Sequence, residues 1–121
     1  MNYKPGIVIF MARDLERARS FYADTLGLPV VDTEPNFITL NTAGDCLIGL
    51  QNAANLKPGE TAEPGSTELG LEVSDADAAW RELKARGVTT LTDLADMPFG
   101  RTFDLRDPDG HLLTIYRPNQ R

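Results

Sequence analysis

Hydrophobic side chains follow two different spacings near the start of the chain. Residues 6–12 form a continuous apolar run, which is typical of a strand buried on both faces. Apolar residues then recur three and four positions apart, at Leu15, Ala18, Tyr22 and Leu26. This spacing places them on one face of a helix, and Asp14 and Gly27 are suited to cap its two ends. The pattern predicts a buried strand followed by an amphipathic helix.

Short apolar segments separated by turn residues complete the first half of the chain. They predict three strands, at 29–33, 37–40 and 46–51. A polar stretch with two Pro-Gly pairs, at 58–59 and 64–65, follows the last of them. It predicts a connecting loop over about residues 53–66.

The same order of patterns starts again after this loop. An apolar strand is predicted at 69–73, and Ser74 or Asp75 would cap a helix that ends at Gly87. Three further strands are predicted at 88–91, 102–105 and 112–116. The sequence therefore predicts a single α+β domain over residues 1–121, built from two βαβββ repeats at about 5–52 and 67–118.

Charge and composition exclude several classes of partner. The net charge of −6, from 12 basic and 18 acidic residues, argues against a nucleic-acid partner. The single cysteine, Cys46, excludes an internal disulfide and fits a reducing cytoplasm. Neither a membrane-spanning apolar run nor a signal peptide is found, so no membrane partner is expected. Arg101 and Arg106 would either meet an anionic ligand or pair with Asp104 or Asp107.

Two motifs give the chain a family resemblance. The first is Asp14-Leu15-Glu16-Arg17-Ala18 with Phe21-Tyr22 and Leu26-Gly27-Leu28, and the second is Phe103-Asp104-Leu105-Arg106-Asp107-Pro108-Asp109-Gly110-His111. Together with the repeat, they resemble the vicinal oxygen chelate superfamily of glyoxalase I, extradiol dioxygenases and bleomycin resistance proteins. The resemblance covers nearly the whole chain and implies two mixed sheets curled around a cleft. It does not fix an activity, because this fold hosts unrelated chemistries.

The resemblance also implies where a metal ion would be bound in metal-dependent relatives. Their four ligand positions, two in each repeat, correspond here to Ile7, Gly49, Glu68 and Thr114. Only Glu68 is a good ligand, whereas a catalytic metal site needs about three protein ligands and one open position. No metal and no other cofactor is therefore expected.

Alternation along the strands extends these positions to a full set of cleft-facing residues. The set is Ile7, Ile9, Met11, Leu47, Gly49, Gln51, Glu68, Gly70, Glu72, Leu112, Thr114 and Tyr116. Residues of the opposite face, such as Phe10 and Leu50, are apolar and suited to pack under the helices. A mostly apolar cleft suits a small organic molecule. Glu68 and Glu72 would favour an amine, and Tyr116 would stack on a planar ring.

These features lead to two function hypotheses. The first is a metal-independent protein that binds a small cationic or aromatic molecule, including sequestration of an antibiotic. The resemblance also implies that two copies of the chain form a homodimer that encloses the ligand. The alternative is an enzyme of the same superfamily, either a metal-free lyase or isomerase with Glu68 as general base, or a metal-dependent glyoxalase-like or dioxygenase-like enzyme.

Three of the polar residues also have a purely structural interpretation. Glu68 would then lie half-solvated at the start of a strand. Thr114 would be a core residue whose hydroxyl bonds to the backbone. His111, the single histidine, follows a turn and is expected to be exposed to solvent rather than catalytic.

Overall fold

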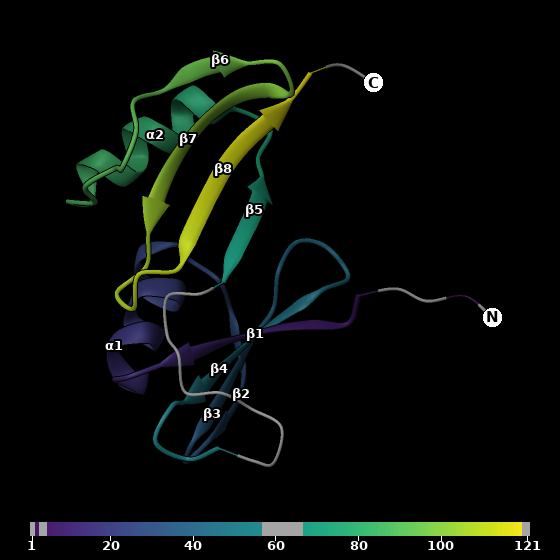
Figure 1. Cartoon of the computed structure of the whole chain (residues 1–121), viewed down its shortest axis with the longest axis vertical. Helices are drawn as coiled ribbons and strands as arrows, with labels where there is room; N and C mark the ends of the chain where they lie inside the picture. The colour runs from purple at the N-terminus through teal and green to yellow at the C-terminus, as the bar shows by residue number, and fades with distance from the viewer. Residues whose placement is uncertain (1, 3–4, 57–66, 120–121) are drawn as a thin grey trace. The chain divides into compact units, whose positions relative to one another are not determined.

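The chain is organised as two compact units. The computed structural model describes residues 2, 5–56 and 67–119, and the units span 1–65 and 66–121. Each holds one four-stranded mixed sheet with a helix packed on one face, as Figure 1 shows. The two predicted βαβββ repeats are thus confirmed. That they form one domain stays a prediction, and the expected loop at 53–66 lies mostly outside the described residues.

The first unit follows the predicted order of elements. They are β1 (Ile7–Ala12), α1 (Leu15–Arg19), the π-helical segment η1 (Ser20–Thr25), β2 (Val30–Glu34), β3 (Phe37–Leu40) and β4 (Leu47–Asn52). The strand order in the sheet is β1-β4-β3-β2, with β1 parallel to β4 and the other pairs antiparallel. The first and last strands of the repeat therefore lie side by side.

The first helical segment begins where the sequence predicts. The Asp14 carboxylate accepts a hydrogen bond from the backbone N–H of Arg17 at 3.1 Å, which caps the helix. In η1 the helix is wider, because its hydrogen bonds span five residues. The N–H of Leu26 donates to the carbonyl of Phe21 at 2.9 Å. Gly27 then leaves the helical conformation with a φ of 80°.

The core of the first unit lies between the sheet and this helical segment. Tyr22 is fully buried and stacks on Phe10 with the ring centroids 5.5 Å apart. Alternate strand residues complete the core: Ile38, Leu40, Ile48 and Leu50. Burial of each such side chain contributes about 1.5–3 kcal/mol, so this face of the sheet is committed to packing. The opposite, helix-free face remains available for other contacts.

The second unit repeats the arrangement. Its elements are β5 (Glu68–Glu72), α2 (Ala76–Ala85), β6 (Ala95–Met97), β7 (Gly100–Arg106) and β8 (Leu112–Pro118), with the strand order β5-β8-β7-β6. Asp75 caps α2 by accepting a hydrogen bond from the N–H of Ala78 at 3.0 Å. The core side chains under α2 are Phe103, Leu105, Leu113 and Ile115. No helix of the described part is long and apolar enough to cross a membrane.

The strand predicted at 88–91 is wrong, because the strand that pairs with β7 is β6, at 95–97. The tight connection through Pro98 and Phe99 sets this register, since it places Met97 opposite Gly100. Residues 88–91 make a single backbone bond to β7, from the N–H of Leu91 to the carbonyl of Asp104 at 2.8 Å. One bond is not a ladder, so the β-branched residues of this segment remain outside the sheet.

The expectation that His111 is exposed is also wrong, because its side chain is completely buried. The turn before it is closed by Asp107, whose carboxylate accepts hydrogen bonds from the N–H groups of Asp109 and His111 at 2.9 and 2.8 Å. The chain then enters β8 beside the start of β5, where the His111 Nδ1 accepts a hydrogen bond from the N–H of Thr67 at 3.2 Å. His111 therefore anchors the entry into β5.

Candidate ligand-binding site

The helix-free face of the first sheet carries two rows of side chains that run across all four strands. The row nearest the β2–β3 turn consists of Met11, Gln51, Phe37 and Glu34. The row beside it consists of Ile9, Gly49, Thr39 and Asp32. Directly paired residues share a face of the sheet, so apolar, amide, aromatic and acidic groups lie next to one another here.

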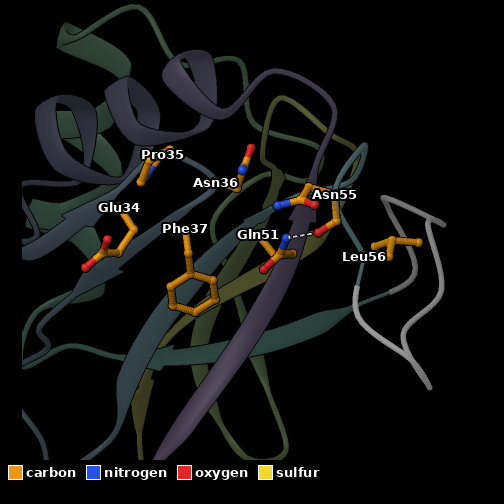
Figure 2. Close-up of a pocket in the computed structure, with 7 residues that line it drawn as sticks. All are labelled: Glu34, Pro35, Asn36, Phe37, Gln51, Asn55 and Leu56. Carbon is orange, nitrogen blue, oxygen red and sulfur yellow. Dashed lines mark hydrogen bonds between the residues drawn. The ribbon is translucent and has the colours of Figure 1, made fainter.

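A pocket of about 340 Å³ opens at the end of this face. Figure 2 shows the side chains around it. It is lined by Glu34, Pro35, Asn36, Phe37, Gln51, Asn55 and Leu56. Pockets for small organic ligands measure about 300–1,000 Å³ and combine apolar walls with a few placed polar groups. The volume of this pocket lies in that range, and the Phe37 ring forms one of its walls beside several polar groups.

Hydrogen bonds hold the rim of the pocket in place. The Gln51 amide nitrogen donates to the backbone carbonyls of Asn52, at 3.0 Å, and of Asn55 (Figure 2). The Asn52 side chain donates to the Asn36 side chain at 3.0 Å, and their backbones are bonded at 2.9 Å. These bonds fix the orientation of the Gln51 amide before any ligand arrives, which lowers the entropic cost of binding.

Gly49 has no room for a side chain. A Cβ atom built on it would collide with the Phe37 ring and would lie 3.2 Å from the Cδ1 atom of Ile7. Phe37 and Ile7 therefore cover the position that corresponds to the second metal ligand in the resemblance. The ring that closes this position is also the ring that lines the pocket.

The helix-free face of the second sheet has an aromatic pair of its own. The Tyr116 ring lies over Gly70, since a Cβ atom at that glycine would be 3.3 Å from the ring. Phe99, about half exposed, meets Tyr116 edge to face with the centroids 6.2 Å apart. Glu72 is paired with Tyr116 in the register of β5 and β8. This face therefore offers a ring surface beside a carboxylate.

The residues at the four family positions do not fit a metal ion. Thr114 donates its hydroxyl hydrogen to the Asp104 carboxylate at 2.8 Å, so its predicted bond to the backbone is wrong, and a neutral hydroxyl is a poor metal ligand. Glu68 is exposed on the edge strand β5. Ile7 and Gly49 offer no donor atom. In the described ranges, no three His, Cys, Asp or Glu side chains are grouped as a metal site would need.

The two arginines near the last hairpin have other partners than predicted. Arg101 bonds to Asp77 on α2 at 2.9 Å and to Asp96 at 3.3 Å. The hydrogen bond from Arg101 lowers the pKa of Asp77 and raises the pKa of Arg101 itself. Arg106 donates to the carbonyl of Gly110 at 2.9 Å, within its own turn. Pairing with Asp104 or Asp107 is therefore wrong.

The predicted site residues thus fall into one group on each sheet. The helix-free face of the first sheet carries Ile7, Ile9, Met11, Leu47, Gly49 and Gln51, and that of the second carries Glu68, Gly70, Glu72, Leu112, Thr114 and Tyr116. Their role in ligand binding stays a prediction. The sequence reasoning missed Glu34 and Phe37, although Ile38 and Leu40 alternate with Phe37 and Thr39 and could have assigned Phe37 to this face.

The fold agrees with a comparison of the sequence to known protein families. Residues 5–115 match the family described as the Glyoxalase/Bleomycin resistance protein/Dioxygenase superfamily. The chain belongs to this superfamily.

Individual relatives are more distant. The chain is 24% identical over 117 residues to the phenazine antibiotic resistance protein EhpR of Enterobacter agglomerans, which covers 92% of this chain and 89% of that protein. It is similar in structure to TnmS3, an antibiotic binding protein from Streptomyces sp. CB03234, with 25% identity, a TM-score of 0.83 and 98% of both chains covered. A glyoxalase/bleomycin resistance protein/dioxygenase from Nocardioides shares the fold, with 24% identity, a TM-score of 0.84 and 99% and 86% of the two chains covered.

Proposed function

We propose that this protein binds a small planar organic molecule of the antibiotic type, without a metal ion and without converting it. Sequestration of that molecule would protect the cell that makes the protein. The observation that carries the proposal is the Phe37 ring, which covers Gly49 and at the same time lines a pocket of about 340 Å³. An aromatic ring stands where a metal-dependent relative would present a ligand.

The proposal that no metal takes part rests on the side chains at the four family positions. Two of them, Ile7 and Gly49, have no donor atom, and the hydroxyl of Thr114 is bonded to Asp104. A single carboxylate, on the exposed Glu68, is too little to hold a divalent ion. The same exposure leaves the enzymatic alternative, with Glu68 as general base, without support.

The proposal that the ligand is planar rests on the aromatic side chains. Phe37 on the first sheet, and Tyr116 with Phe99 on the second, present ring faces or edges on helix-free surfaces. Offset stacking on such rings contributes about 0.5–1.5 kcal/mol beyond the area buried. The names of EhpR and TnmS3, which concern phenazine resistance and antibiotic binding, agree with a ligand of this kind.

The proposal includes a homodimer in the cytoplasm. Large apolar side chains are exposed on the strands and loops of both units, among them Val31, Leu91 and Met97. Exposed apolar surface is often covered by a partner subunit. Sedimentation of the purified protein that gives the mass of one chain at micromolar concentration would contradict this part.

Calorimetric titration with phenazine tests the proposed function. We expect saturable binding, and chromatography of the recovered ligand should show it unchanged after long incubation. Phe37→Leu should weaken binding several-fold, because the ring face is lost while a strand-compatible apolar side chain remains. Phe21→Leu, the same exchange on η1 and outside the pocket, is the matched control. No saturation at high micromolar phenazine and related planar antibiotics would contradict binding, and a converted ligand would contradict sequestration.

A further inference from the structure

The polar groups of the pocket on the first sheet lie on two sides of an aromatic ring. In Figure 2 the Glu34 carboxylate lies on one side of the Phe37 ring and the Gln51 amide on the other. The strand register explains this arrangement, because Glu34 pairs with Phe37 and Phe37 pairs with Gln51. A flat molecule placed against the Phe37 ring would therefore reach both polar groups with its edges.

Among the residues that the structure describes, those that line this pocket carry a net negative charge. Glu34 carries the only charge among the described residues that line the pocket. Within residues 2, 5–56 and 67–119, no basic side chain forms an ion pair with Glu34. Asp32, two residues earlier on β2, adds to the negative potential on the same face.

The Gln51 amide adds an acceptor on the other side of the ring. Its nitrogen donates to the carbonyls of Asn52 and Asn55. This leaves the amide oxygen as the group turned away from Asn55 (Figure 2). The pocket thus presents a carboxylate and an amide oxygen, both acceptors, which suit N–H donors of a ligand.

We infer that this pocket selects planar ligands that carry a positively charged nitrogen over neutral planar ligands of the same shape. The inference rests on the proposed function, and it assigns the choice of ligand to Glu34. The ring system stacks on Phe37, the cationic N–H group donates to the Glu34 carboxylate, and a second N–H donates to the Gln51 oxygen. The negative face of the Phe37 ring adds to the attraction for a cation.

A pair of dyes with the same ring system tests this selection. Proflavine is a cation at neutral pH and carries amino groups on both edges, whereas acridine is neutral and carries none. We expect proflavine to bind more tightly than acridine to the unchanged protein. Glu34→Gln should weaken proflavine binding by about fivefold, the upper range for a solvent-exposed ion pair, and should change acridine binding by less than about twofold.

Asp32→Asn is the matched control. It removes one negative charge from the same strand and the same face but does not line the pocket. If its effect on proflavine equals that of Glu34→Gln, the selection is a general field effect and the inference is overturned, while the proposed function stands. The inference is likewise overturned if Glu34→Gln weakens the binding of both dyes equally. If neither dye nor phenazine saturates the unchanged protein, the proposed function fails and the inference fails with it.

Discussion

At the scale of single residues, Gly49 is a position with little room for change. Its missing side chain makes room for the Phe37 ring, and the Cδ1 atom of Ile7 would be only 3.2 Å from an added Cβ. Gly49→Ala should lower the free energy of unfolding by about 1–3 kcal/mol, the usual cost of overpacking. Urea denaturation measures the change.

Gly44→Ala provides the matched control, because a Cβ atom there would meet only the Thr42 hydroxyl, at 3.9 Å. That exchange should be neutral or stabilise the protein by about 0.4–1 kcal/mol, since alanine restricts the unfolded chain. In a protein that already carries Phe37→Leu, Gly49→Ala should lower the free energy of unfolding by less than it does in the unchanged protein. A Gly49→Ala variant as stable as Gly44→Ala would show that the ring yields freely and that Gly49 is not constrained.

The sequence predicted Gly49 as a site position but not the ring that covers it. Alternation along one strand tells which face a residue belongs to, and it did so correctly for Phe10 and Leu50, both buried. Which neighbour lies over a glycine depends on the register between strands and on side-chain rotamers. Neither can be obtained from spacing along the chain, so the contact between Phe37 and Gly49 was not predictable, although the face on which Phe37 lies was.

At the scale of elements, one ion pair joins α2 to the strands beneath it. Arg101 on β7 holds Asp77 in the first turn of α2 and lowers the pKa of Asp77 below its ordinary value of 3.8. Because the folded-state pKa is the lower one, this stabilisation is fully present above the unfolded-state pKa. It is lost as the pH falls through the folded-state pKa.

Asp77→Asn should therefore lower the stability at neutral pH, and the difference from the unchanged protein should vanish in strong acid. Thermal unfolding across this range gives the measurement. Glu82→Gln is the control, because the Glu82 carboxylate pairs with Arg86, the C-cap residue of the same helix, at 2.7 Å. A stability gap for Asp77→Asn that persists unchanged into acid would mean that the carboxylate charge is not what holds α2.

Element boundaries were predictable where a local signal exists. Asp14 caps its helix as predicted, and of the two candidates Ser74 and Asp75 it is Asp75 that caps the second, since an Asp side chain reaches the backbone N–H three residues on. The segment 88–91 was predicted as a strand from its β-branched residues. The turn at Pro98 and Phe99 instead pairs residues 95–97 with β7. His111 was misjudged because it is buried beside a residue far away in the sequence, Thr67, whose N–H donates to its ring.

At the scale of the whole molecule, the two repeats have the same topology but carry different side chains at corresponding positions. Gly49 and Thr114 occupy corresponding strand positions in the two sheets, and so do Gln51 and Tyr116. One member of each pair is small or aromatic where the other is polar. The two sheets share one topology, while the side chains on their helix-free faces differ, and this is why the fold was predictable and the ligand was not.

If the fold is stable without a metal ion, a chelator should not change its unfolding. Dialysis against EDTA should leave the midpoint of thermal unfolding where it was, because the described residues supply no set of metal ligands. A planar ligand such as phenazine should instead raise the midpoint. At a free concentration one hundred times its Kd, a ligand that binds only the folded state adds about 2.7 kcal/mol to the free energy of unfolding. A midpoint that falls after EDTA and is restored by one divalent ion would overturn the metal-free proposal, since only a bound ion stabilises the fold in that way.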